Sequence, residues 1–269
     1  MSASLAAGTR SQKSRAGARA SLKPADPPID LSEQDGVRHL HFGSVWIQGA
    51  MRIRRPFEIE LDYVRNMMAW LLFMAPPQDV LQLGLGAGAL TKWSWRFLPP
   101  TRVTAVESSA GVIAACHQWF ALPPPDERLR LVCADAGEFV ARPCERGRYG
   151  VIQVDVYDRD ARGPVLDSLA FYRDCRRCLV SPGMLVLNLF GGDQRSFTEN
   201  LERVIEVFDS QVLVLPPVAA GNLVVLAFSG PPLSVDSHDL FARADYLKKQ
   251  WRLPGPDWAK ALRHAIPGV

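Results

Sequence analysis

Apolar residues along the chain form short runs that alternate with stretches of helical spacing. The runs are four to six residues long and bounded by Gly, Pro or charged residues, which is typical of strands buried on both faces. Five runs predict parallel strands, at residues 80–83, 103–106, 129–133, 151–154 and 184–189. Three stretches predict helices between them, at residues 89–97, 110–120 and 164–179. This alternation predicts an α/β protein with a doubly wound parallel sheet, right-handed crossovers and helices on both faces.

Two antiparallel features flank the predicted sheet. Residues 37–51 alternate large apolar and polar side chains around Gly43, which predicts a small β-hairpin before the sheet. Residues 211–215 and 223–228 form two further apolar runs with no predicted helix between them. We therefore expect these two strands to pair antiparallel at the end of the sheet.

Further helices are predicted near both ends of the chain. Apolar positions at helical spacing run from Pro56 to Phe73, with acidic residues in the first turns where the helix dipole favours them. Residues 237–251 and a short segment from Pro256 predict two terminal helices. The chain then divides into four parts: a disordered basic tail (1–28), a β-hairpin with a lead-in helix (29–75), a Rossmann-like domain (76–230) and a C-terminal helical extension (231–269).

The first 28 residues are rich in Ala, Ser, Gly, Lys and Arg and contain almost no large apolar side chain, so we expect them to be disordered. Their composition also resembles an organelle transit peptide. They lack the spaced large apolar residues of an amphipathic helix, which favours a loose tail. The formal charge of +3 comes from this tail, because residues 26–269 contain 26 basic and 28 acidic residues. A body so close to neutral has no global electrostatic reason to bind nucleic acid.

Membrane and metal functions are not indicated by the sequence. The longest apolar run, Met67 to Ala75, has nine residues, well short of the roughly 20 that cross a bilayer. Five cysteines without a secretory leader predict reduced thiols in a cytoplasmic protein. Cys175 and Cys178 have C-x-x-C spacing, but they lie late in a predicted helix and lack a second pair of ligands. We expect two helix cysteines rather than a redox or metal site.

The chain passes from its first core strand to a helix through a glycine-rich turn. Within residues 79–92, D-V-L-Q-L-G-L-G-A-G-A-L-T-K, the glycines are Gly84, Gly86 and Gly88. Glycines allow tight backbone angles and close approach of a ligand, and free N–H groups at a helix start attract polar groups. The G-x-G-x-G pattern is weaker than a full dinucleotide fingerprint and by itself also fits a tight connection. No Gly-Lys-Ser/Thr follows, which argues against a triphosphate site.

Acidic residues follow three successive strands. Glu107, Asp135 and Asp155 each lie at or just beyond the carboxyl end of a predicted strand. In an open α/β sheet, ligands bind in the crevice at these ends, so we expect the three acids to converge on the glycine turn. Glu107 follows Gly88 by 19 residues, close to the ~20-residue offset at which an acid binds ribose hydroxyls. Each acid alone could cap a helix or lie in a solvated loop, but three in the same register predict a nucleoside site.

Six segments resemble the spermidine synthase family of polyamine aminopropyltransferases, in order and over about residues 36–230. They are L-G-L-G-A-G, V-E-S-S, C-A-D-A-G-E-F, Y-G-V-I-Q-V-D-V-Y-D, F-Y-R-D-C-R-R-C-L-V-S-P-G-M-L-V-L-N and G-N-L-V-V-L-A-F. The resemblance implies a Rossmann-like doubly wound sheet of the S-adenosylmethionine-dependent methyltransferase type. Because methyltransferases share that fold, fold alone does not choose between the two activities.

The resemblance also implies roles for individual residues. Asp155 would help to deprotonate the attacking amine and Asp158 would hold the diamine, with Tyr157 beside the acceptor. Glu107 would bind the ribose, and Asp135 with Ala136 would bind the adenine. The co-substrate would be decarboxylated S-adenosylmethionine, or S-adenosylmethionine itself, with no permanently bound cofactor.

The chain departs from the family pattern near the expected cations. Ala87 stands where synthases usually have an acid in the glycine turn, and Ser109 replaces the second acid of V-E-I-D. The strand Gln that helps to hold the nucleoside has no match unless Gln48 serves, and the late Tyr-Pro element is absent. Arg159 and Arg162 place positive charge beside the D-x-x-D loop, which suits an acidic substrate better than a diamine. The chain is therefore a divergent member.

Three hypotheses follow from the sequence. A methyltransferase would bind intact S-adenosylmethionine, whose carboxylate suits the uncharged turn at Ala87. A non-catalytic relative would keep the nucleoside site and lose the chemistry. We favour the aminopropyltransferase, because the order and spacing of all six segments agree with that family. We expect a small-molecule amine as substrate and no nucleic-acid or membrane partner, and we leave a homodimer open.

Overall fold

The computed structural model describes residues 27–157, 166–192 and 194–266. The predicted tail, apart from its last two residues, lies outside these ranges. Asp158, Arg159 and Arg162 lie outside them as well.

A seven-stranded sheet forms the centre of the molecule, with strand order β6-β5-β4-β7-β8-β10-β9. Its strands are β4 (Asp79–Leu83), β5 (Arg102–Glu107), β6 (Leu129–Cys133), β7 (Tyr149–Val154), β8 (Leu179–Phe190), β9 (Val212–Val214) and β10 (Asn222–Ser229). The five strands from β4 to β8 are parallel, and β10 runs antiparallel between β8 and β9. This arrangement confirms the doubly wound sheet and its terminal antiparallel pair.

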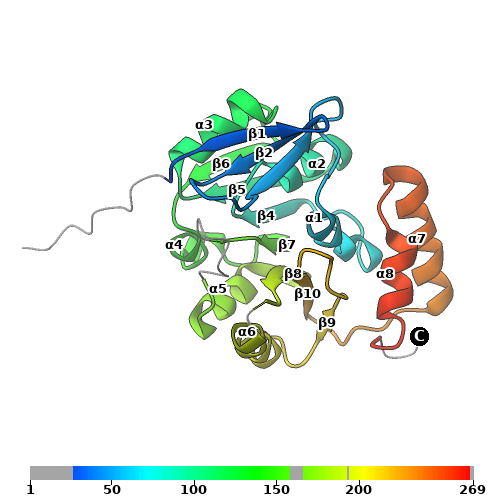
Figure 1. The fold of residues 1–269 in the computed structure, drawn as a ribbon. Coiled ribbons are helices and arrows are strands. Elements are labelled where there is room, and N and C mark those ends of the chain that lie inside the picture. Colours follow the sequence, from blue (N-terminus) through cyan, green and yellow to red (C-terminus); the bar gives the residue numbers. More distant parts are fainter. Residues whose placement is uncertain (1–26, 158–165, 193, 267–269) are drawn as a thin grey trace, which may run out of the picture.

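Helices cover both faces of the sheet, because successive side chains of a strand point to opposite faces. The helices are α1 (Asp62–Asn66), α2 (Ala89–Phe97), α3 (Ala110–Trp119), α4 (Ala136–Val140), α5 (Leu169–Cys178), α6 (Gln194–Val207), α7 (Ser237–Trp251) and α8 (Gly255–Leu262), with 3₁₀ helices η1 (Ala69–Leu72) and η2 (Pro143–Glu145). Val80 and Val151 pack with α1, η1, α2, α7 and α8 on one face. Their neighbours Leu81 and Ile152 pack with α4, α5 and α6 on the other. Figure 1 shows these two groups of helices on opposite sides of the sheet.

The predicted hairpin is part of a three-stranded antiparallel sheet, formed by β1 (Asp30–Gln34), β2 (Val37–His41) and β3 (Gly49–Arg52). Strands β2 and β3 pair across the loop that contains Gly43, as the alternation predicted. Strand β1 was not predicted. It joins β2 through a tight turn at Asp35 and Gly36, both with positive φ. All five residues of β1 are exposed, so its sequence lacks the alternation of a half-buried strand.

The predicted lead-in helix from Pro56 to Phe73 is wrong as a single helix. The chain is irregular up to α1, and only α1 and η1 are helical within this range. Leu61 stands at the N-cap of α1 and provides no side-chain hydrogen bond to the free N–H groups. The Arg65 guanidinium donates to the backbone carbonyl of Ile59, which stabilises the irregular approach to the helix.

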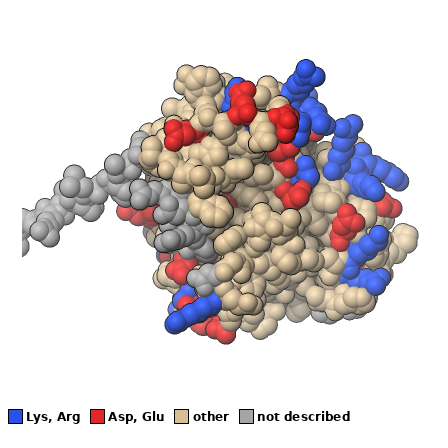
Figure 2. Space-filling model, in the orientation of Figure 1, with Lys and Arg blue, Asp and Glu red and all other residues tan. Residues whose placement is uncertain are grey.

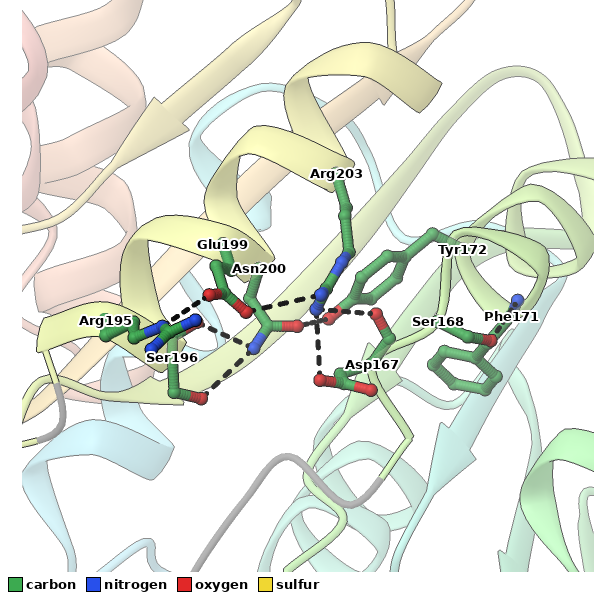
Figure 3. A network of polar contacts seen from close by, with 9 residues as sticks. All are labelled: Asp167, Ser168, Phe171, Tyr172, Arg195, Ser196, Glu199, Asn200 and Arg203. Atoms are coloured by element: carbon green, nitrogen blue, oxygen red, sulfur yellow. Dashed lines mark hydrogen bonds and ion pairs between the residues drawn. The ribbon is translucent and has the colours of Figure 1, made fainter.

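Helix α6 lies between β8 and β9 and was not predicted. Its buried residues Val204 and Val207 share one face with Phe197 and Leu201 at helical spacing, so the sequence does carry an apolar pattern for this helix. Figure 3 shows how this helix is attached to α5: the Tyr172 hydroxyl donates to Asn200 Oδ1 at 2.7 Å, and Arg203 binds the Asp167 carboxylate at 3.0 Å. These bonds join the start of α5 to α6.

The five cysteines are free thiols, and Cys175 and Cys178 are buried on α5, as expected. No helix within the described ranges is long and apolar enough to cross a membrane. Lys and Arg side chains gather on the side where Figure 1 places α7 and α8, and the centre of the same face is mostly uncharged (Figure 2). Lys248 and Lys249 in the last turn of α7 and Lys260 on α8 are exposed.

Candidate active site

A cavity of about 1160 Å³ lies where the strands of the central sheet end. Seven of the predicted site residues line it: Gly84, Gly86, Glu107, Asp135, Ala136, Asp155 and Tyr157. Gly88 is not part of the lining, and Asp158 lies outside the described residues. Much of the remaining wall comes from the β2–β3 loop, the start of α1 and the residues before it, the ends of β8 and β10, and the loop before β10. The structure therefore brings the three strand-end acids into one cavity with the glycine turn.

The glycine turn has no space for side chains at its first two glycines. Gly84 has φ +89°, and a Cβ atom there would lie 2.1 Å from the backbone carbonyl oxygen of Asp155. Gly86 has φ +51°, and its Cβ would lie 2.8 Å from the carbonyl oxygen of Gln48. Gly88 also has a positive φ and is the N-cap residue of α2. The first two glycines thus allow the turn to pack against the backbones of Asp155 and Gln48 at the cavity wall. Gly88 marks the start of α2, outside the cavity lining.

Glu107 ties the glycine turn to the start of α3. Its Oε2 accepts from the Leu85 backbone N–H at 3.1 Å, and its Oε1 accepts from the Ser109 backbone N–H at 3.0 Å. Ser109 in turn caps α3, because its hydroxyl oxygen accepts from the Val112 N–H at 3.1 Å. An ionised carboxylate has about four lone-pair positions, so these bonds leave acceptor capacity that faces the cavity.

Asp135 and Ala136 form the start of α4. The Asp135 Oδ1 atom accepts from the Glu138 backbone N–H at 2.8 Å, which is an N-cap bond. Asp135 is exposed and Ala136 is buried, and both line the cavity. The second carboxylate oxygen of Asp135 remains available to a ligand.

Asp155 follows β7 and is held by two side chains from other elements. Its Oδ1 accepts from Asn188 Nδ2 at 2.8 Å, and its Oδ2 accepts from the Tyr63 hydroxyl at 3.4 Å. Burial raises the pKa of Asp155, and the hydrogen bonds from Asn188 and Tyr63 oppose that rise. A carboxylate with a raised pKa is a stronger base once it is ionised, which suits proton transfer.

Tyr157 lines the cavity with its ring, while its hydroxyl donates to the backbone carbonyl of Asn188 at 3.0 Å. Burial raises the pKa of the Tyr157 phenol, so the hydroxyl stays protonated. The phenol is therefore a structural donor, and the ring is what a ligand in the cavity meets.

Tyr63, Asn188 and Asn222 also line the cavity, and sequence reasoning missed all three. Asn188 was the most detectable, since it is a lone amide within the apolar run of β8 and is only 2% exposed. A buried amide needs hydrogen-bond partners, and such a residue near a strand end marks a polar site. Tyr63 and Asn222 carry no comparable signal in the sequence.

The structure shows where two residues lie: Ala87, which departs from the family pattern, and Gln48, the candidate for its nucleoside-binding Gln. Ala87 is buried in an apolar cluster with Leu40, Met51 and Phe120 and is not part of the cavity lining. A Cβ atom at Gly49 would lie 2.5 Å from the Ala87 backbone nitrogen, so β3 covers this part of the turn. Gln48 does line the cavity.

Two buried ionisable groups lie outside the cavity lining, close to the glycine turn. The Lys92 ammonium donates to the Phe120 carbonyl at 2.7 Å, and burial lowers the pKa of Lys92 to about 8. The Cys116 thiol donates to the Gly86 carbonyl at 2.9 Å, and burial raises the pKa of Cys116 to about 12. Cys116 therefore stays a neutral thiol that supports the turn, and it is not a nucleophile.

Among the described residues, the charged side chains of the cavity wall are all acidic. Five carboxylates line it, and no Lys or Arg does within the described ranges: the acids are Glu60, Asp62, Glu107, Asp135 and Asp155. Arg52 pairs with Glu60, and Arg65 with Asp62 at 2.8 Å, while Glu107 and Asp155 have no described cationic partner. The site is suited to a positively charged ligand.

Comparison with known proteins identifies relatives over most of the chain. A polyamine aminopropyltransferase of Neisseria meningitidis serogroup A is 38% identical over 236 residues, which cover 86% of this chain and 89% of the relative. Another of Chromobacterium violaceum is 33% identical over 239 residues, covering 89% and 90%. No protein-family model matches the sequence.

Solved structures share the fold at lower sequence identity. A probable spermidine synthase from Corynebacterium glutamicum has a TM-score of 0.67 and 20% identity, covering 90% of this chain and 92% of its own. Human methyltransferase-like protein 13 in complex with SAH has a TM-score of 0.64 and 23% identity, covering 72% and 93%. These similarities confirm the methyltransferase-type fold that the sequence predicted.

Proposed function

Because the chain belongs to the polyamine aminopropyltransferase family, we propose that it transfers an aminopropyl group from decarboxylated S-adenosylmethionine to a small amine such as putrescine. The relatives support this activity over nearly the whole chain. The observation in the structure that carries the proposal is that Asp155, a buried carboxylate held by Asn188 at 2.8 Å, shares one cavity with Glu107 and the glycine turn.

The donor would lie along the ends of β4, β5 and β6. Glu107 would accept hydrogen bonds from the ribose hydroxyls with the lone pairs that Leu85 and Ser109 leave free. Asp135 and Ala136, at the start of α4, would contact the adenine. Gly84 and Gly86, whose close backbone contacts leave no room for side chains, would form the turn beside the sulfonium end of the donor.

The acceptor amine would lie at Asp155. The amine nitrogen attacks the propyl carbon that is bonded to the sulfonium, a carbon–nitrogen bond forms, and the carbon–sulfur bond breaks. The electron pair of that bond returns to sulfur, so methylthioadenosine leaves uncharged. The proton of the attacking amine passes to the Asp155 carboxylate. Most of the acceleration would come from alignment of the two substrates and from this base.

Tyr157 and Asp158 complete the proposed acceptor site. The Tyr157 ring would pack beside the carbon chain of the amine, because its hydroxyl is bonded to the Asn188 carbonyl. Asp158, which lies outside the described residues, would bind the second ammonium of a diamine.

A methyltransferase would share the fold, and the neutral turn at Ala87 would not repel the carboxylate of intact S-adenosylmethionine. The carboxylate-lined cavity and the relatives favour aminopropyl transfer. Calorimetry with the two donors separates these activities. We expect decarboxylated S-adenosylmethionine to bind more tightly than S-adenosylmethionine, because the cavity wall repels the extra carboxylate. Tighter binding of S-adenosylmethionine would contradict the proposal.

A further inference from the structure

Three side chains from neighbouring strands form a row that ends at Asp155. Asn222 begins β10, Asn188 lies on β8, and Asp155 follows β7. Asn222 Nδ2 donates to Asn188 Oδ1 at 3.1 Å, and Asn188 Nδ2 donates to Asp155 Oδ1 at 2.8 Å. Each side chain in the row therefore donates to the next one, from Asn222 at the cavity wall to the proposed base.

The middle member of the row is a group with two orientations. A carboxamide keeps its shape when it rotates by half a turn, but its donor and acceptor exchange places. In the observed orientation, the Asn188 NH₂ group faces the carboxylate. In the opposite orientation its oxygen would face Asp155, so two acceptors would be in contact. Since Asn188 is only 2% exposed, water cannot replace a lost partner.

We propose that Asn222 is a positioning residue for the reaction: by donating to Asn188 Oδ1, it holds the Asn188 amide with its NH₂ group toward Asp155 and so keeps that carboxylate ionised. This inference rests on the proposed function. On the side away from Asp155, the Asn188 amide is contacted by Asn222. The NH₂ group of Asn222 pairs with the oxygen of the Asn188 amide and not with its NH₂ group. The chemistry of residue 222 therefore decides which end of the amide the base meets.

Few other titratable groups face the Asp155 carboxylate from the described elements. Tyr63 on α1 and Tyr157 after β7 are phenols whose pKa burial raises, so both stay neutral where the enzyme would work. The facing residues on β8 and β10 are the amides of Asn188 and Asn222, which do not titrate. The ion-paired acids Glu60, just before α1, and Asp62, its first residue, line the same cavity, as do Glu107 and Asp135.

The replacement Asn222→Asp tests the inference, because it keeps the size of the side chain but can only accept hydrogen bonds when ionised. It would attract the Asn188 NH₂ group and turn the Asn188 oxygen toward Asp155. In the profile of kcat/KM against pH, the acid limb should then move to higher pH by about one unit or more. A pKa change of this size corresponds to the loss of one hydrogen bond to a charged group.

An added charge at residue 222 could also act directly through space, so the experiment needs a double-mutant cycle. Asn188→Leu removes the amide that can rotate. If Asn222 acts through Asn188, the shift caused by Asn222→Asp should fall below about half a unit in the Asn188→Leu background. An equal shift in both backgrounds, or no shift with Asn188 present, would overturn the proposal. Asn222→Ala provides a second variant if Asn222→Asp does not fold, and it should also move the acid limb only when Asn188 is present.

Leu223→Ala is the matched control, since Leu223 is the next residue on β10 and its side chain points to the opposite face of the sheet. It should leave the acid limb in place. Titration of aspartate carboxyl carbons by ¹³C NMR gives a second readout that needs no turnover, with Asp155 assigned as the signal lost in Asp155→Asn. If the wild-type protein formed no product, the proposed function would fail, and this titration would still decide whether Asn222 controls Asp155.

Discussion

The backbone of Asp155 lies directly against Gly84: a Cβ atom at Gly84 would be 2.1 Å from the Asp155 carbonyl oxygen. The first glycine of the turn therefore sets the distance between the donor side of the cavity and the proposed base. Because β4 and β7 are neighbours in the sheet, neither backbone can move away without breaking their pairing.

Gly84→Ala should accordingly damage both stability and the site. A left-handed backbone costs about 1–2 kcal/mol for a residue with a side chain, and the contact with a backbone oxygen adds to that cost. Gly147→Ala is the control, because Gly147 also has a positive φ but nothing lies within 4 Å of its Cβ position. In urea unfolding, we expect Gly84→Ala to lose clearly more free energy than Gly147→Ala, and equal losses would contradict the close contact.

Glu107→Gln should weaken binding of methylthioadenosine by about 1.5–3 kcal/mol, the range for hydrogen bonds to a charged group. The replacement keeps the length of the side chain, but one acceptor oxygen becomes a donor that cannot pair with the Leu85 or Ser109 N–H groups. Calorimetry measures the change. Unchanged affinity in a folded variant would remove Glu107 from the nucleoside site.

Asp155→Asn should lower turnover by about 10²–10⁴ while methylthioadenosine binding persists, because the side chain keeps its shape and loses the base. Since burial raises the pKa of Asp155, the wild-type rate should fall on acidification at a pH above that at which a free aspartate protonates. The profile of kcat/KM against pH tests the sign of this shift. A rate that persists down to the range of a free aspartate would show that Asp155 is not the base.

Lys92→Met tests the buried ammonium near the glycine turn. The pKa of Lys92 falls from 10.5 to about 8 on folding, so the unfolded chain binds more protons between these values. The free energy of unfolding of the wild-type protein should therefore rise relative to Lys92→Met across that interval, by about 3 kcal/mol. Urea unfolding at several pH values measures the difference. A difference that does not change with pH would show that the ammonium is solvated.

The centre of the sheet was predictable because its inner strands, such as β4, β5 and β7, are buried on both faces. Such strands appear in the sequence as apolar runs whatever their neighbours are. The exposed strand β1 lacks that signal and was missed. Helix α6 was also missed, although Phe197, Leu201 and Val204 follow helical spacing. The lead-in helix was predicted too long, because apolar spacing alone does not show that Leu61 fails to cap the helix.

Of the acidic residues and their partners in the candidate site, only the acids at the strand ends could be predicted from the sequence. Glu107, Asp135 and Asp155 could be found because parallel strands end at one edge of the sheet. The partners of Asp155 could not be found in this way, since Tyr63 and Asn188 are 92 and 33 positions away along the chain and only folding brings them together. The burial of Ala87 under β3 likewise depends on the contact with Gly49.

The product assay tests the central claim most directly. The full-length protein is incubated with decarboxylated S-adenosylmethionine and putrescine, and with S-adenosylmethionine and the same amine, beside the Asp155→Asn variant. We predict spermidine and methylthioadenosine in equal amounts from the decarboxylated donor, and at least a hundredfold slower formation by the variant. The absence of both products, together with demethylated product from S-adenosylmethionine, would contradict aminopropyl transfer and establish a methyltransferase.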